Sequence, residues 1–153
     1  MLDKKIGDQT IRLTQLSHGG GCGCKVSPSI LREMLSKLPP QASQPELLLG
    51  FDKNDDAAVY KINQEQGVVA TTDFFMPIVD DPFEFGRIAA TNALSDVYSV
   101  GGSPIMALAI AGFPTEKMSV QQIQEILGGG AKACEDAGIP IAGGHTIDAP
   151  EPI

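Results

Sequence analysis

The sequence predicts an α+β fold in which a mixed β-sheet is covered by helices on one face. Three observations lead to this prediction. Capping residues precede segments with helical periodicity, two short β-rich segments are joined by a link of hairpin length, and one continuous apolar run has the length of a buried strand. The expected order is helix, strand, strand, helix, strand, helix, strand, and such an order places helices against a sheet.

The first helix is expected to begin after Ser27, with Ser27 as N-cap and Pro28 in the first helical position. Five apolar side chains then recur at helical spacing: Ile30, Leu31, Met34, Leu35 and Leu38. Pro39 and Pro40 end the pattern, because the residue before a proline disfavours helical geometry.

Two strands are expected next, over residues 56–62 and 67–72. Both segments carry consecutive small and β-branched apolar residues. The polar link over residues 63–67 has the length and composition of a hairpin connection.

A second helix is predicted from Asp81, with Glu84 three residues after this cap, to about Val100, with Gly101 ending it. The following apolar run over residues 104–112 is predicted to be a buried strand. Since it is apolar on both faces, we expect both faces to be covered.

A third helix is predicted from the capping box of Ser119 and Gln122 to about Ala137. Three consecutive glycines, 128–130, lie inside it, and each costs about 1 kcal/mol relative to alanine. We therefore expect another element to approach closely at these glycines, or the helix to break there.

Composition limits the classes of function. The formal net charge of −8 argues against a basic nucleic-acid surface. It leaves a nucleotide site open, because carboxylates can hold phosphates through a divalent cation. No run of ~18 apolar residues is present, and the N-terminus lacks the apolar core of a signal peptide. We therefore expect a cytoplasmic protein with no membrane segment, whose cysteines are reduced.

A glycine-rich stretch near the N-terminus carries the sharpest local pattern, with Cys22, Cys24 and Lys25 among glycines. A neighbouring lysine favours the thiolate form of cysteine, and glycines let a backbone wrap closely around a substrate. The alternative is a disordered leader with incidental cysteines. In either case we expect residues 1–25 to bury little and to be mobile.

Several aspartates form a second pattern. Asp55 and Asp56 come before one expected strand, Asp73 ends the next, and Asp96 lies on the second helix one turn after Asn92. Carboxylates at strand ends can meet at one rim of a sheet, where they would suit Mg²⁺ with a bound phosphate. Alternatively each aspartate caps or ends an element. Asp96 fits that alternative least, since aspartate is a poor choice in mid-helix.

The last expected strand, residues 139–142, leads into Gly143-Gly144-His145-Thr146. Glycines here would let a backbone approach phosphate, and His145 or Thr146 could donate hydrogen bonds. A tight turn with a capping threonine explains the same residues. Neither a P-loop pattern nor a glycine-rich dinucleotide fingerprint occurs in the chain.

Taken together, five stretches resemble the selenophosphate synthetase family: SHGGGCGCK, DDAAVY, TTDFFMPIVDDPFEFGRIAATNALSD, GGSPIMALAI and AGGHTIDAPEPI. The first is specific to this family, which is part of the wider aminoimidazole ribonucleotide synthetase-like superfamily. The resemblance implies a flexible catalytic leader over residues 1–25 and an N-terminal ATP-binding domain over residues 26–153. That domain would dimerise through its sheet, and the family's C-terminal domain would be absent from this chain.

The activity implied is that of a selenide, water dikinase: selenide, ATP and water give selenophosphate, AMP and orthophosphate. Selenophosphate then serves as selenium donor for selenocysteine and selenouridine. The implied cofactor is Mg²⁺, with a monovalent cation such as K⁺ as a further one. The implied partners are ATP, selenide or a protein-delivered selenium donor, and a second copy of the chain, with neither nucleic acid nor membrane.

The resemblance also implies roles for single residues. Cys22 and Lys25 match catalytic positions, and Asp56 and Asp96 match Mg²⁺ ligands. A further metal-binding aspartate of the family would lie beyond Ile153. Positions that match nucleotide-binding residues are Lys25, Lys53, Asn54, Asp55, Asp73, Asp96, Gly144, His145 and Thr146.

Two alternatives stay open. One is another ATP-using synthetase of the superfamily, which would lack the GCGCK leader. The other is a non-catalytic thiol- or metal-sensing domain that uses Cys22 and Cys24.

Overall fold

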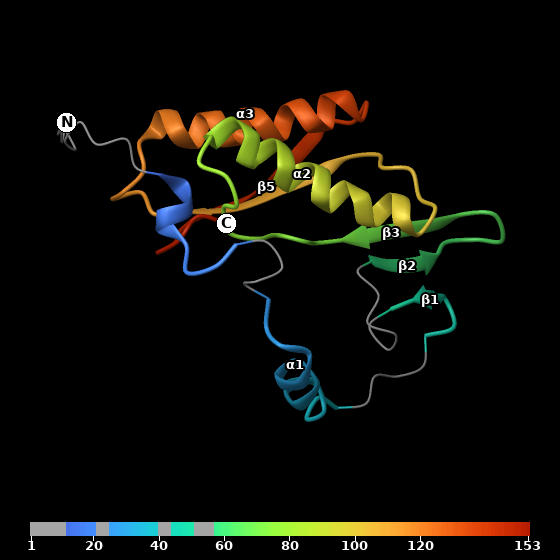
Figure 1. The fold of residues 1–153 in the computed structure, drawn as a ribbon. Coiled ribbons are helices and arrows are strands. Elements are labelled where there is room, and N and C mark those ends of the chain that lie inside the picture. The colour runs from blue at the N-terminus through green and yellow to red at the C-terminus, as the bar shows by residue number, and fades with distance from the viewer. Residues whose placement is uncertain (1–11, 21–24, 40–43, 51–56) are drawn as a thin grey trace.

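The computed structural model describes residues 12–20, 25–39, 44–50 and 57–153 (Figure 1). Its elements, in chain order, are the 3-10 helix η1 (Leu13–Leu16), α1 (Pro28–Leu35), β1 (Leu47–Leu49), β2 (Ala57–Lys61), β3 (Gly67–Thr71), α2 (Pro82–Ser99), β4 (Ala107–Phe113), α3 (Val120–Asp136) and β5 (Ile141–Asp148). The class is α+β, as predicted.

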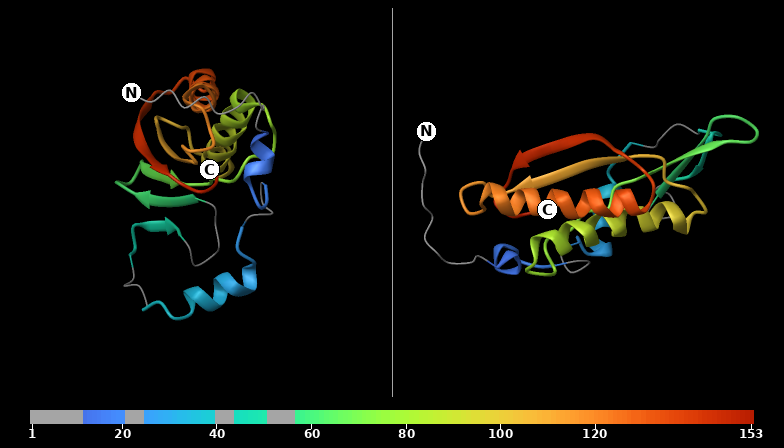
Figure 2. Two further views of the ribbon diagram at one scale, coloured as in Figure 1. Left: turned by 90° about the vertical axis from the view of Figure 1, so that its left-hand side faces the viewer. Right: turned by 90° about the horizontal axis from the view of Figure 1, so that it is seen from above.

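The described strands form two sheets. One is antiparallel with the order β1-β2-β3, and the other pairs β4 with β5 in parallel. Both kinds of pairing therefore occur, but in two sheets rather than in one mixed sheet. The long helices α2 and α3 lie side by side on one face of the strands (Figures 1 and 2), which confirms the predicted covering. α1 lies apart from them on the other side of the strands (Figure 1).

The hairpin is confirmed, and its polar link explains the turn. β2 and β3 pair in antiparallel register from Ala57 with Thr71 to Lys61 with Gly67. The Asn63 side-chain oxygen accepts hydrogen bonds at 2.9 Å from the backbone N–H groups of the two residues before Gly67. Asparagine favours turns because its side chain can replace backbone partners in this way.

The long helices begin where their capping residues predict. The Asp81 carboxylate accepts a hydrogen bond from the Glu84 backbone N–H at 2.9 Å. Ser119 and Gln122 form the full capping box, with each side chain bonded to the other's backbone N–H. Gly101 follows α2 with a φ of +78°, a conformation that costs glycine little.

Glycines allow α2 and α3 to pack backbone against backbone. A Cβ added to Gly86 would lie 1.8 Å from the Ile126 carbonyl oxygen, and one added to Gly129 would lie 1.9 Å from that of Phe83. Any larger residue at either position would overlap the facing helix. The close approach expected at the glycine run is therefore confirmed, and α3 stays helical through it.

The core lies between these two helices, the strands and the N-terminal leader. Its buried members are Leu13, Phe75, Phe85, Ala111, Phe113, Met118 and Ile126. Leu13 is fully buried and Leu16 packs against the same cluster. The expectation that the leader buries little is thus wrong for Leu13 and Leu16, because these two apolar side chains of the 3-10 helix pack into the core.

β4 is only partly covered. Its last residues, including Ala111 and Phe113, are buried, but Leu108 and Ile110 are 62% and 50% exposed. Within this chain the helices pack on one face of the strand only, so the expectation that both faces are covered stays a prediction that requires a second copy of the chain.

β5 is longer than predicted. The alternative of a tight turn over residues 143–146 is wrong, because this segment continues the strand and pairs with β4 from Leu108–Gly143 to Ala111–Thr146. Gly144 has a φ of +155°, and a Cβ there would lie 1.8 Å from the Ala109 carbonyl oxygen. Glycine thus serves close strand pairing at this position rather than a turn.

α1 begins at Pro28 as predicted, although the Ser27 hydroxyl makes no capping bond and instead lies 3.1 Å from the Ser29 hydroxyl. Its predicted apolar stripe is exposed at four of five positions: Ile30, Leu31, Met34 and Leu38.

Within the described ranges, no helix has the length and apolar character needed to cross a membrane.

Candidate functional site

The candidate site is the seam between β3 and α2. Thr71 and Asp73 lie two residues apart on extended chain, so their side chains share one face. Asn92 and Asp96 lie four residues apart on α2 and share one face of that helix. The Thr71 hydroxyl donates to Asp96 Oδ2 at 2.9 Å, and Asn92 Nδ2 donates to Asp73 Oδ2 at 2.9 Å. We call these four residues the β3–α2 seam.

Lys25 extends the seam toward the leader. Its Nζ lies 3.0 Å from Asp73 Oδ1, so each carboxylate oxygen of Asp73 has its own donor. The Lys25 side chain is 47% exposed and that of Asp73 is 18% exposed. An ion pair this exposed contributes about 1 kcal/mol or less to stability. The main effect of the ion pair is on position, because it holds the Lys25 ammonium group beside Asp73 and Asn92.

Asp96 is the buried member of the seam. It is 9% exposed and is the one charged residue classed as buried among the described residues. Thr71 donates to it, but no lysine, arginine or histidine in the described part of the chain forms an ion pair with it. A buried carboxylate without a cation is unfavourable. Its oxygens are the hard donors that Mg²⁺ prefers, so the residue fits a divalent cation.

Five predicted site residues lie outside the described residues: Cys22, Lys53, Asn54, Asp55 and Asp56. The second expected ligand of Mg²⁺, Asp56, is among them. Within the described ranges, no group of three or more His, Cys, Asp or Glu side chains is placed to hold a metal.

The remaining predicted residues fall into two groups. Lys25, Asp73 and Asp96 meet at the seam, as expected for carboxylates at a strand end and on the facing helix. Gly144, His145 and Thr146 instead lie in exposed β5. Among the described residues, no hydrogen bond joins these three to Asp73 or Asp96.

Thr71 and Asn92 are the members of the seam that sequence reasoning did not assign to a site. A signal was present, because Asn92 precedes the mid-helix Asp96 by one turn. Asn92 and Asp96 lie on one face of a helix rich in alanine, and this pattern indicates that polar residues of another segment pack against that face.

Comparison with known proteins gives the class first. Residues 54–153 match the family model described as "AIR synthase related protein, N-terminal domain", so the chain belongs to this family.

The similar curated proteins are more particular. The chain is 63% identical over 142 residues to "Selenide, water dikinase" of Burkholderia orbicola (strain MC0-3), which covers 93% of this chain and 40% of that protein. It is 64% identical over 148 residues to the protein of the same name from Pseudomonas straminea, with 95% and 41% covered. The chain thus spans about two fifths of the length of these relatives.

Solved structures support the fold. A structure described as "AaThiL complexed with AMPPCP and TMP" matches with a TM-score of 0.56 and 23% identity, covering 90% of this chain and 39% of that one. Thiamine monophosphate kinase from Aquifex aeolicus matches with a TM-score of 0.51 and 21% identity, covering 78% and 36%. At this identity the likeness concerns the fold alone.

Proposed function

We propose that this chain is the nucleotide-binding domain of an enzyme that converts selenide, ATP and water into selenophosphate, AMP and orthophosphate. The observation that carries the proposal is the identity of 63–64%, over nearly the whole chain, to proteins named selenide, water dikinase. Those names favour this reaction over the other synthetases of the superfamily and over a thiol- or metal-sensing domain.

The seam supports the proposal chemically. Phosphoryl transfer depends on positioning and on neutralising charge around the transferring group. Asp73 and Asn92 hold each other at 2.9 Å, and Asp73 orients the Lys25 ammonium at 3.0 Å. In the proposal this ammonium faces phosphate oxygens of ATP and offsets their charge. Asn92 is a positioning residue, since it acts through Asp73.

Asp96 and Asp56 are the proposed ligands of Mg²⁺. When bound, the metal supplies charge neutralisation at phosphate oxygens. Of the two residues, only Asp96 lies in the described part of the chain. This assignment is favoured because its carboxylate is buried and forms no ion pair with a cationic side chain among the described residues. K⁺ is a further proposed cofactor.

Cys22 is the proposed residue that orients the reduced selenium species. Its thiol could hold selenide by a hydrogen bond before the transfer, with no bond formed between sulfur and selenium. The proposal places Lys53, Asn54 and Asp55, together with the exposed 144–146 segment of β5, in contact with the nucleotide.

We also propose that a second copy of the chain covers the strands. β4, β5 and the segment before β4 expose large apolar side chains: Ile105, Met106, Leu108, Ile110, Ile141 and Ile147. A contiguous apolar surface of this kind marks an interaction site, and a two-fold dimer is the commonest solution.

Binding of Mg–ATP tests the proposed function directly. A ligand at 100 times its Kd stabilises a protein by about 2.7 kcal/mol. For a domain of this size that corresponds to a rise in Tm of about 5–10 °C. We expect this rise for Mg–ATP and a much smaller one for ATP with EDTA. Equal Tm values with and without Mg–ATP would contradict the proposal.

A further inference from the structure

The N-terminal leader runs alongside residues 73–80 in the opposite direction. The Thr14 hydroxyl and backbone N–H donate to Asp80 Oδ1 at 2.6 and 3.2 Å. Further along the leader, a Cβ added to Gly20 would lie 3.0 Å from the Ile78 side chain. The leader therefore meets this segment at two successive points, with later leader residues meeting earlier segment residues.

The Lys25–Asp73 contact continues the same order. Lys25 comes five positions after Gly20, and Ile78 comes five positions after Asp73. Five extended residues reach at most about 18 Å. A leader fixed near Gly20 therefore limits the Lys25 backbone to a range that includes the contact with Asp73, whereas an unfixed leader would allow a wider range.

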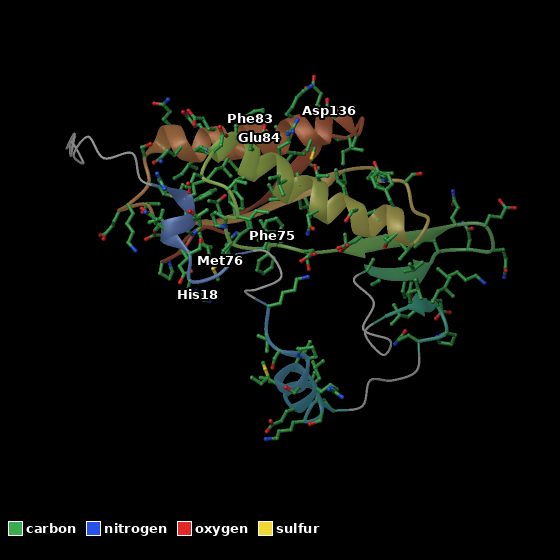
Figure 3. The ribbon with its side chains drawn as sticks, viewed as in Figure 1. His18, Phe75, Met76, Phe83, Glu84 and Asp136 are labelled. Carbon is green, nitrogen blue, oxygen red and sulfur yellow. The ribbon has the colours of Figure 1, made fainter. Side chains whose placement is uncertain are left out.

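His18 supplies a fixed point directly before the glycines. Its backbone N–H donates to Glu151 Oε2 at 3.1 Å, and its ring Nδ1 lies 2.9 and 2.8 Å from Oε1 and Oε2. Figure 3 shows His18 beside η1, below the segment that carries Phe75 and Met76. The hydrogen bonds from His18 lower the pKa of Glu151, so the carboxylate is ionised at neutral pH.

Glu151 is held on a rigid part of the chain. Gly112 and Ile153 exchange two backbone hydrogen bonds of 3.0 Å, which join the C-terminal segment to the end of β4. Pro152, next to Glu151, is fully buried. The carboxylate therefore stands on a backbone anchored in the core, while its partner His18 precedes a glycine-rich stretch.

We propose that His18 and Glu151 form a positioning pair that fixes the path of the leader and so places Lys25 on Asp73. Glycines have high conformational freedom, so a fixed point close to them restricts the positions that the residues after them can reach. Tethering raises the effective concentration of a group at its target. The inference extends the proposed function, since it names the contact that brings Lys25 to the seam.

Chemical labelling of Lys25 tests this pair without an activity assay. Acetylation by N-hydroxysuccinimidyl acetate is followed by peptide mass spectrometry, with Lys37 as internal reference. In Glu151→Ala we expect the Lys25 rate to rise about two- to fivefold, the range for losing an exposed ion pair. Asp73→Asn gives, for comparison, the rate of a Lys25 that has lost its contact with the Asp73 carboxylate.

Substitutions of His18 and of Glu151 should raise the acetylation rate of Lys25 by different amounts. His18→Ala keeps the backbone N–H bond to Glu151, so the rise in the Lys25 rate should be smaller than in Glu151→Ala. The double variant should match Glu151→Ala alone. Asp148→Asn is the matched control, because Asp148 also bonds a backbone N–H and a hydroxyl, both of Thr115, and among the described residues no hydrogen bond joins it to the leader. It should leave the Lys25 rate unchanged.

Amide exchange by NMR at residues 17–20 completes the test. Faster exchange in Glu151→Ala, with α2 and α3 unchanged, is expected. An unchanged Lys25 rate in Glu151→Ala would overturn the positioning role, and so would an equal rise in Asp148→Asn. Neither readout requires nucleotide, so the pair can hold even if Mg–ATP fails to bind and the proposed function falls.

Discussion

Thr71 donates its hydroxyl proton to the buried carboxylate of Asp96 at 2.9 Å, across the seam between a strand and a helix. The pair joins a β-hairpin to the helix that also carries Asn92. The Asp96 carboxylate is 9% exposed, and no cation among the described residues pairs with it. Such a buried charge should lower the stability of the free protein, whereas in the proposed function it favours binding of Mg²⁺.

The first prediction separates these two effects. Asp96→Asn removes a buried charge, so the free energy of unfolding without ligand should stay equal or rise by about 1 kcal/mol. The rise in Tm caused by Mg–ATP should fall to less than half. Thermal unfolding with and without Mg–ATP measures both. Asp136→Asn, on the exposed end of α3, is the control and should keep the ligand shift.

The second prediction concerns the contact between α2 and α3. Gly129→Ala should cost about 3 kcal/mol of unfolding free energy, because the new methyl group would overlap the Phe83 carbonyl. Gly128→Ala is the neighbouring control, since its Cβ would meet only the Phe83 ring at 3.9 Å. It should be neutral or stabilise by up to about 1 kcal/mol through helix propensity. Urea unfolding compares the two, and equal losses would contradict the close approach.

The third prediction concerns the second copy of the chain. Leu108→Lys places a charge in the exposed apolar surface of β4 and should shift the protein from dimer to monomer. Val120→Lys, at a position 72% exposed on α3, should leave the dimer unchanged. Sedimentation velocity at tens of micromolar, about the usual working range, distinguishes these states. A wild-type monomer would end the proposal of a dimer.

The fourth prediction concerns acid. Hydrogen bonds from Thr115 lower the pKa of Asp148 below its usual 3.8, those from Thr14 do the same for Asp80, and those from His18 lower that of Glu151 below 4.5. A lowered pKa in the folded state stabilises the protein above the unfolded pKa, and this stabilisation is lost as the pH falls through the folded pKa. Stability should therefore decline below about pH 4.5.

Asp148→Asn tests this acid dependence at one site. The amide does not titrate, so the slope of unfolding free energy against pH between about 2 and 4 should become shallower. Urea unfolding at several pH values gives the slope. A slope equal to that of the wild type would show that the Thr115 bonds do not carry the effect.

Local chemistry accounts for the elements that the sequence predicted well. Asp81 and the Ser119–Gln122 box specify helix starts by bonds to their own backbone, and the glycine run indicates a close neighbour. These features depend on residues a few positions apart. The sequence could also predict that Asp73 and Asp96 lie at the same seam, because one carboxylate is at a strand end and the other is on a helix face.

Long-range packing accounts for the features that sequence reasoning missed. Leu13 is buried by Phe75, Phe85 and their neighbours, none of which is near it in sequence. The segment 143–146 is a strand because β4 lies beside it, although its own glycines favour a turn. Asn92 gains its significance from Asp73, which faces it only in the folded chain.

The glycine contact between α2 and α3 also affects how the β3–α2 seam responds to substitutions in the core. Carbonyl groups and Cα atoms have no rotamers, so the spacing between α2 and α3 is set by main-chain atoms at Gly86 and Gly129. Conservative replacement of a core side chain such as Ile126 can then loosen the domain without changing how α2, which presents Asn92 and Asp96, is seated on α3. The arrangement of the polar residues on α2 is therefore insensitive to small changes in the core, and the two positions at which it is most easily disturbed are glycines.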